Sequence, residues 1–212
     1  MIPSKREFNQ ALKMRHGEAL HARFSAAVIA VCGLGGLGSN IAVSLARAGV
    51  GKLILIDFDQ VDVSNLHRQQ YKASQIGLDK TQALSQNLLE ISPYIELETH
   101  TARIIDEDDV RRLLSSADII CEAFDQPEAK SMLTNAVLEL LPDKYLIAAS
   151  GMAGLGSANT IQTRRITSHF YLCGDRFSDV KDEPGLMAPR VALCASHQAL
   201  MALRILANEF DA

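Results

Sequence analysis

The sequence predicts an α/β protein with a Rossmann-like, mostly parallel sheet and helices on both faces of that sheet. Short apolar runs alternate with helical patterns over residues 1–150, as in chains that form parallel sheets. A glycine-rich turn, Gly33–Ser39, directly follows the first apolar run, as in nucleotide-binding βαβ units. Two stretches within residues 159–173 then alternate in polarity, which predicts additional antiparallel strands near the C-terminus.

Five apolar runs predict the parallel strands, near residues 27–32, 52–57, 95–100, 119–123 and 145–149. Helical patterns lie between them, near residues 37–48, 80–91, 106–115 and 127–140. Asp79 suits the N-cap of the second of these helices. Ser92-Pro93 should end that helix, because the residue before a proline avoids the helical region.

We expect one domain of three parts: a helical extension (1–24), a Rossmann-like core (25–150) and a C-terminal region (151–212). The last region should hold the antiparallel strands, a mobile loop and a long helix near residues 188–208. Gly151–Ser157 and Gly174–Gly185 are rich in glycine and polar residues. We therefore expect both to be flexible loops without bulky side chains.

The composition is that of a globular chain with a substantial core. The chain has 212 residues, 48% of them hydrophobic and 22% charged, with a formal net charge of -4. No basic tract favours a nucleic-acid partner, and no apolar segment is long enough to predict a membrane span. The N-terminus lacks an apolar signal core, and the four cysteines form no Cys-x-x-Cys pair. We therefore expect a cytoplasmic protein without structural zinc.

The glycine turn has the spacing of a nucleotide-binding fingerprint. Gly33-x-Gly35-x-x-Gly38 is followed after 19 positions by Asp57, near the usual spacing to a ribose-binding acid. The helix N-terminus that follows the turn offers free N–H groups and a positive dipole end to an anion. A glycine turn without a ligand is the alternative, but the strand before the turn and the acid after it favour a nucleotide.

The connection between Asp57 and Lys80 is unusually long and carries Asn65 and Arg68. Such loops are usually functional or disordered. Lys80 opens a helix, where a cation opposes the helix dipole. Solvent exposure is the simpler explanation for Arg68 or Lys80 alone, but together, beside the glycine turn, they favour a polyanion site.

Asp125 directly follows the expected strand at 119–123, which places it at the carboxyl edge of the sheet with the glycine turn. A carboxylate at this edge can hold Mg²⁺ beside a triphosphate. Asp125 can equally cap a helix that begins at Pro127, since proline suits the first helical turn. The spacing leaves both roles open.

Together these motifs resemble the ThiF/MoeB adenylyltransferases, which are relatives of the ubiquitin-activating enzymes. The resemblance lies in four places: Gly33–Ser39, Asp57–Gln69, Gly77–Lys80 and Asp125. The pattern Asp-Phe-Asp…Ser-Asn-Leu-x-Arg-Gln is the most specific part, since simple Rossmann dehydrogenases lack it. Three further stretches resemble the short ThiF-type branch that adenylates a thiamine-pathway sulfur carrier: Ala148–Ser157, Phe170–Asp175 and Gly185–Arg204.

The resemblance implies an ATP site. The nucleotide would lie against four glycines, Gly33, Gly35, Gly36 and Gly38. The phosphates would be held by three residues of the long connection, Asn65, Arg68 and Lys80. Asp57 would bind the ribose hydroxyls, and Asp125 would hold Mg²⁺ and be essential for adenylation. These catalytic roles come from the resemblance and not from spacing.

The resemblance also implies a homodimer whose partner subunit supplies an N-terminal arginine. Arg15 is the first candidate and Arg6 the second, although either suits an ordinary surface position. Cys173 stands where MoeB-type proteins have a zinc-binding cysteine. Some ThiF proteins link to their carrier through a later cysteine, but none occurs between Gly174 and Leu193, which disfavours a covalent step. Cys173 is the only cysteine near a polar loop and is therefore the candidate for a reactive one.

The leading interpretation is an ATP-dependent adenylyltransferase for the C-terminal glycine of a small ubiquitin-like sulfur carrier with a Gly-Gly tail. Assignment to thiamine thiazole biosynthesis follows from the resemblance. One alternative is ATP-dependent cyclisation of a modified tRNA base, against which the acidic charge and short length count. A second is an NAD-dependent oxidoreductase, supported by the glycines and Asp57 only. A third is a non-catalytic, ATP-binding scaffold that recruits a carrier, which Arg68, Lys80 and Asp125 disfavour.

Overall fold

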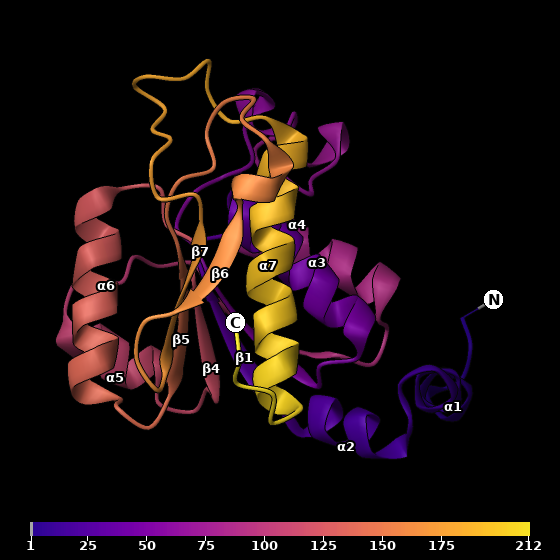
Figure 1. Cartoon of the computed structure of the whole chain (residues 1–212). Helices are drawn as coiled ribbons and strands as arrows, with labels where there is room; N and C mark the ends of the chain where they lie inside the picture. The colour runs from indigo at the N-terminus through magenta and orange to yellow at the C-terminus, as the bar shows by residue number, and fades with distance from the viewer. Residues whose placement is uncertain (1) are drawn as a thin grey trace.

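The structure is a computed structural model that describes residues 2–212. One seven-stranded sheet has the order β3-β2-β1-β4-β5-β7-β6 (Figure 1). The strands are β1 Val28–Cys32, β2 Lys52–Ile56, β3 Glu96–His100, β4 Ile119–Glu122, β5 Tyr145–Ala149, β6 Gln162–Arg165 and β7 Phe170–Gly174. All neighbours pair in parallel except β6 and β7, which are antiparallel. The predicted fold class is therefore confirmed.

Helices cover both faces of the sheet, with α3, α4 and α7 on one face and α5 and α6 on the other (Figure 1). The helices are α1 Lys5–His16, α2 Glu18–Ala26, α3 Gly36–Ala48, α4 Lys80–Ile91, α5 Glu107–Leu114, α6 Pro127–Leu140 and α7 Ala188–Leu206. Short 3-10 helices are η1 Val63–Asn65, η2 Ala73–Gln75 and η3 Ala158–Thr160. Among residues 2–212, no helix combines the length and apolarity needed to cross a membrane.

The central strands are buried on both faces, which explains why they are continuous apolar runs and not alternating ones. In β1, Ile29 and Val31 pack into the core under α3 and α7, whereas Ala30 and Cys32 pack into the core under α5 and α6. The edge strand β3 has no fully buried residue and alternates in polarity. The buried strands therefore form a rigid platform below the loops at their carboxyl ends.

The chain reverses direction across the sheet between β1 and β4. It runs from β1 outward to β3 and then returns to the other side of β1. The carboxyl ends of β1 and β4 meet at this switch point, where open α/β sheets bind ligands. They touch closely, because a Cβ on Gly33 would lie 2.7 Å from the carbonyl oxygen of Ala123.

The N-terminal extension is two helices and not one, because Gly17 has a φ of +83° between α1 and α2. α1 buries none of its residues and projects from the body at the lower right of Figure 1. It lies near the amino ends of the strands, where a Cβ on Gly49 would contact Leu12. The loops after β5 and β7 gather at the opposite end, at the top of Figure 1.

Candidate functional site

The glycine turn between β1 and α3 is packed too tightly for side chains at two positions. Gly33 has a φ of +92°, and a Cβ on Gly38 would lie 1.8 Å from the carbonyl oxygen of Gly33. The N-cap residue of α3, Gly35, makes no side-chain capping hydrogen bond. The leading N–H groups of α3 therefore remain directed at the switch point, where an anion can accept them.

Asp57 joins the end of β2 to this turn. Its Oδ2 accepts a hydrogen bond from Leu34 N–H at 2.5 Å, and its Oδ1 accepts one from Asp59 N–H at 2.8 Å. Burial raises the pKa of the Asp57 carboxyl, an effect that nearby Lys80 and the two N–H donors only partly oppose. Each carboxylate oxygen keeps a further lone pair, so Asp57 can still accept hydroxyl donors.

Lys80 opens α4 and is not solvated. Its side chain is only 6% exposed, and its Nζ lies 2.8 Å from Asp59 Oδ2 and 4.0 Å from Asp57 Oδ2. Burying an ammonium costs desolvation free energy, and lysines are rarely buried unless they are paired or functional. Lys80 is buried beside two carboxylates at the edge of the sheet where ligands bind. The solvent-exposed explanation of Lys80 is therefore wrong.

Arg68 lies across the start of α3. Its Cγ would be 3.4 Å from a Cβ on Gly36, and its Nη1 donates to the carbonyl oxygen of Ser64 at 3.2 Å. Within residues 2–212, Arg68 Nε and the neighbouring Gln69 Oε1 are buried without a hydrogen-bond partner. Such orphaned polar atoms are rare in native proteins and call for a missing partner. A phosphate bound beside Arg68 at the start of α3 would supply one.

Asn65 ends η1 on the same connection. Its Oδ1 accepts from Asp62 N–H and its Nδ2 donates to Ser64 Oγ, both at 3.4 Å. Bonds of this length are weak, so a ligand can compete for the amide. The connection itself is held firmly, because Asn40 of α3 donates to the carbonyl oxygen of Arg68 at 3.2 Å.

Asp125 lies on the turn between β4 and α6 and is exposed. The N-cap residue of α6 is Gln126, which makes no side-chain capping bond. The structure therefore gives no support to a capping role for Asp125. Likewise, Asp79 occupies the N-cap of α4 without a side-chain capping bond, and its Oδ1 instead accepts from Gln60 Nε2 at 3.4 Å.

The donor set fits Mg²⁺ only together with phosphate. Residues 2–212 contain no group of three or more His, Cys, Asp or Glu side chains placed to hold a metal ion. Mg²⁺ commonly binds through one or two carboxylates, with phosphate oxygens and waters completing its octahedron. The exposed Asp125 carboxylate fits that kind of site and does not form a metal site of its own.

The two N-terminal arginines do not join this cluster within one chain. Both Arg6 and Arg15 are exposed on α1. The last turn of α1 adjoins α2, where the His16 ring packs against Phe24, whose carbonyl oxygen accepts from Gly51 N–H before β2. Arg15 therefore lies by the amino ends of the strands, opposite the glycine turn.

A buried ion pair ties together the two C-terminal loops. Arg190, in the first turn of α7, pairs with Asp175 and donates to the carbonyl oxygens of Ala153, Gly156 and Ser157. These bonds hold the 151–157 loop against the segment after β7, so the expected freedom of that loop is wrong. The expected lack of bulky side chains is also wrong, because Phe177 and Leu155 are largely exposed there.

All four cysteines are fully buried. Burial raises the pKa of Cys173 to about 11, although a hydrogen bond with Thr163 partly opposes it. Burial likewise raises the pKa of Cys194 to about 12. A buried thiol with a raised pKa is a poor nucleophile, so neither residue has the environment of a covalent catalytic cysteine.

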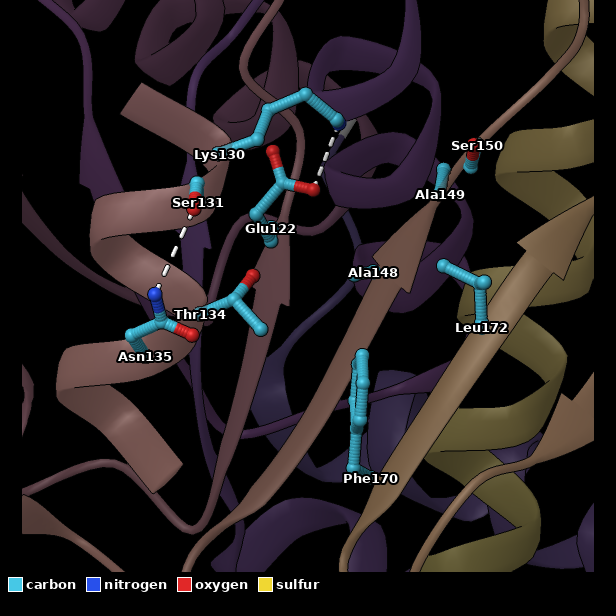
Figure 2. Close-up of a pocket in the computed structure, with 10 residues that line it drawn as sticks. All are labelled: Glu122, Lys130, Ser131, Thr134, Asn135, Ala148, Ala149, Ser150, Phe170 and Leu172. Atoms are coloured by element: carbon cyan, nitrogen blue, oxygen red, sulfur yellow. Dashed lines mark hydrogen bonds and ion pairs between the residues drawn. The ribbon is translucent and has the colours of Figure 1, made fainter. Parts of the chain in front are cut away.

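Sequence reasoning missed three charged residues around the site: Glu122, Lys130 and Arg190. Glu122 and Lys130 form an ion pair at the head of an open hollow between α6 and the strands β5 and β7 (Figure 2). One signal was available for two of them: Glu122 ends an apolar strand, and Arg190 interrupts an apolar helix. Charges inside apolar runs need a buried partner.

The chain belongs to the ThiF family, whose model matches residues 9–211. Among curated relatives, molybdopterin-synthase adenylyltransferase of Salmonella typhimurium is 32% identical over 185 residues, covering 85% of this chain and 73% of the relative. The adenylyltransferase and sulfurtransferase MOCS3 of Dictyostelium discoideum is 28% identical over 193 residues. The chain spans only 43% of that relative, and 31% of a ubiquitin-like modifier-activating enzyme 5 from Caenorhabditis elegans.

Solved structures share the fold. The E. coli tRNA N6-threonylcarbamoyladenosine dehydratase TcdA, in complex with ATP, has a TM-score of 0.85, with 99% of this chain and 98% of that chain covered. Its sequence is 22% identical. E. coli MccB in complex with ATP has a TM-score of 0.71 and 22% identity, over 91% of this chain and 59% of MccB. At these identities the likeness shows a common fold and no more.

Proposed function

We propose that the chain is an ATP-dependent adenylyltransferase that activates the C-terminal carboxylate of a small carrier protein. One observation carries the proposal: the Arg68 side chain lies across the start of α3, where its Cγ would be 3.4 Å from a Cβ on Gly36, and its Nε is buried and unpartnered among residues 2–212. A cation at the positive end of a helix is unfavourable by itself and becomes favourable when an anion binds beside both. Lys80, paired with Asp59, is a further cation at the same edge, which suits a triphosphate.

In the proposed reaction, a carboxylate oxygen of the carrier attacks the α-phosphorus of ATP. The bond from that phosphorus to the bridging oxygen of the β-phosphate breaks, and pyrophosphate leaves with the electron pair. No proton transfer and no protein nucleophile are needed, which agrees with the buried cysteines. Catalysis is then positioning and charge neutralisation, by Arg68 and Lys80 on the phosphates and Asp57 on the ribose. Asp125 would hold Mg²⁺, which supplies further charge neutralisation when bound.

The names of the curated relatives support an adenylation reaction. For the carrier, we propose a ubiquitin-like sulfur carrier with a Gly-Gly tail, because glycine lets the reacting carboxylate approach within about 3–3.5 Å of phosphorus. The stretches Ala148–Ser157, Phe170–Asp175 and Gly185–Arg204 favour a thiamine-pathway carrier. The likeness to TcdA makes a modified tRNA the competing substrate, which the net charge of -4 disfavours.

The test is carrier-dependent exchange of labelled pyrophosphate into ATP. We expect exchange with a ThiS-like carrier and Mg²⁺, and none when the last glycine of that carrier is replaced by valine. Exchange that persists with the tail deleted contradicts a protein carboxylate as substrate. Parallel samples with tRNA identify the competing substrate. ATP with Mg²⁺ should also raise the melting temperature by mass action, and NAD should not.

The homodimer is part of the same proposal, since Arg15 lies opposite the glycine turn of its own chain. Variants Arg15→Ala and Lys80→Met should each be inactive alone. If Arg15 serves the partner's site, a re-equilibrated mixture should regain about a quarter of the wild-type exchange, because half the dimers carry one intact site. A mixture that stays inactive, with dimers verified by ultracentrifugation, contradicts this role.

A further inference from the structure

The turn that carries Asp125 is held by a buried ion pair. Glu122 is fully buried at the end of β4, and its Oε2 accepts from Lys130 Nζ of α6 at 2.7 Å. Its Oε1 accepts from Phe124 N–H at 2.7 Å, and Lys130 Nζ also donates to the Phe124 carbonyl oxygen at 3.2 Å. Figure 2 shows the pair bridging β4 and α6. Both backbone polar groups of Phe124 are therefore bound within one clamp.

The clamp is anchored from the opposite face of the sheet as well. Gln198 of α7 is fully buried and its Nε2 donates to the carbonyl oxygens of Glu122 and Ile147, each at 3.0 Å. It thereby fixes β4 against β5 just before the turn begins. The β4–α6 turn also packs against the glycine turn, because a Cβ on Gly33 would lie 2.7 Å from the carbonyl oxygen of Ala123. Asp125 is thus an exposed residue on a closely held backbone.

Such a clamp is costly if it only adds stability. Burial raises the pKa of the Glu122 carboxyl, an effect that Lys130 and its hydrogen bonds oppose only in part. Apolar residues of similar volume often replace buried ion pairs without loss of stability. The clamp instead specifies the backbone path of one residue, Phe124, directly before Asp125. A carboxylate that shares Mg²⁺ with a phosphate needs its backbone placed to within a fraction of an ångström.

We propose that Glu122 and Lys130 are positioning residues, which hold the β4–α6 turn so that Asp125 meets the metal and phosphates bound at the glycine turn. The inference rests on the proposed function, and it extends that function to residues that do not touch the substrates. Lys130 Nζ is engaged within the clamp, by Glu122 Oε2 and the Phe124 carbonyl oxygen, so we assign it a positioning role and not that of a phosphate ligand.

The experiment compares Lys130→Met, Lys130→Arg and the double variant Glu122→Gln/Lys130→Met with wild type. Val137→Ala is the matched control, because Val137 is fully buried in the same helix and lies about two helical turns after Lys130. The first readout is the extra rise in melting temperature that Mg²⁺ gives over ATP alone. Asp125→Ala should abolish this rise and so calibrates it. The second readout is pyrophosphate exchange as a function of Mg²⁺ concentration.

We expect Lys130→Met to reduce the extra melting-temperature rise and to lower kcat for exchange by about tenfold to a hundredfold, the cost of a misplacement near 1 Å. The melting-temperature rise that ATP gives without Mg²⁺ should be unchanged in Lys130→Met. Lys130→Arg should retain most of the extra rise with Mg²⁺ and most of kcat. Val137→Ala should lower the melting temperature with no change in Mg²⁺ dependence. The double variant leaves no buried charge, so it tests the inference if Lys130→Met does not fold.

Two outcomes are distinguishable. If Lys130→Met and the double variant behave as Val137→Ala does, with a lower melting temperature and an unchanged response to Mg²⁺, the clamp is structural only and the inference is wrong. If wild type shows no exchange with any carrier, the proposed function is wrong. The thermal response to Mg²⁺ and ATP then still reports whether the clamp positions Asp125.

Discussion

The glycine-turn region and the C-terminal loops lie at the same edge of the sheet but satisfy their charges differently. Around the glycine turn, burial raises the pKa of Asp57, and Arg68 keeps a buried Nε without a partner among residues 2–212. In the loops, burial also acts to raise the pKa of Asp175, but hydrogen bonds from Ser178, Phe177 and Arg190 outweigh it and lower that pKa.

The difference separates binding from scaffolding. A buried charge whose partners are complete, such as Asp175, holds the chain in place. A buried charge whose partners are incomplete is more costly in the free protein and becomes complete when a ligand binds. On this basis we propose that the glycine-turn region binds ATP and that the Arg190–Asp175 pair shapes a wall along which the proposed carrier tail approaches.

The largest expected effect is at Asp125. Because Asp125 is exposed and does not cap α6, Asp125→Ala should leave the melting temperature nearly unchanged. It should nevertheless abolish carrier-dependent pyrophosphate exchange. Glu128→Ala, an exposed acid in the first turn of the same helix, is the matched control and should retain exchange. A loss of about 1 kcal/mol in stability with activity retained indicates a cap instead.

The contrast between the regions also explains how much of the molecule sequence could predict. The buried strands and the helices at Lys80–Ile91 and Pro127–Leu140 follow from local pattern, and their predicted bounds agree with the structure. Contacts between distant residues do not follow from local pattern. Arg190 reaches back to the 151–157 loop, so a glycine-rich segment that looks flexible in sequence is held in place.

The same limit applies within the site. The glycine spacing and Asp57 could be recognised because one βαβ unit contains them all, and the structure places Lys80 beside Asp57. The Glu122–Lys130 pair could not be recognised, because its meaning depends on α6 packing over the end of β4. Burial also decides one alternative: Lys80, for which solvent exposure is the simpler explanation when it is taken alone, is buried and pairs with Asp59.

The second largest effect should follow from breaking the Arg190–Asp175 ion pair. Arg190→Met leaves Asp175 buried without its cation, so it should lower the free energy of unfolding by about 3–5 kcal/mol. If the C-terminal loops are a scaffold and not part of the nucleotide site, Arg190→Met should raise KM for the carrier. The rise in melting temperature that ATP produces should then stay unchanged. Urea unfolding and thermal shift on one preparation measure both quantities. A lost response to ATP contradicts the separation of the two regions.

The pH dependence of stability should have opposite signs at Asp175, in the C-terminal loops, and at Glu122, before the β4–α6 turn. The lowered pKa of Asp175 stabilises the fold above its ordinary value of 3.8, and this contribution is lost as pH falls through the folded-state pKa. The raised pKa of Glu122 means that proton binding to this carboxyl is stronger in the fold than in the unfolded chain, so stability falls as pH rises from 4.5 through the folded-state pKa.

Two variants isolate these signs in melting curves recorded from about pH 2 to pH 7. Asp175→Asn should flatten the loss of stability on the acid side, and Glu122→Gln should flatten the loss on rising pH. Asp175→Asn should leave the loss of stability on rising pH unchanged, and Glu122→Gln should leave the loss on the acid side unchanged. Equal flattening of one limb by both variants contradicts the assignment of opposite signs.

The smallest effect should come from the charges of the loop after β7. Asp175 is buried with Arg190, so the exposed charges of this loop are Asp179, Asp182 and Glu183 against Arg176 and Lys181, which sum to 2 − 3 = −1. A net charge this small cannot steer a carrier strongly. Asp182→Asn should therefore change the association rate by less than about threefold. Rates measured at two salt concentrations should differ little.

The most exposed large apolar side chain of this loop is Phe177, which is 83% exposed and lies beside the Arg190–Asp175 ion pair. A large aromatic residue on a held backbone supplies contact area to a partner at low entropic cost. Phe177→Ala should raise KM for the carrier by about tenfold, through faster dissociation, and should leave ATP binding unchanged. A larger effect of Asp182→Asn than of Phe177→Ala, or a steep salt dependence, means that the carrier reads charge at this wall and not apolar surface.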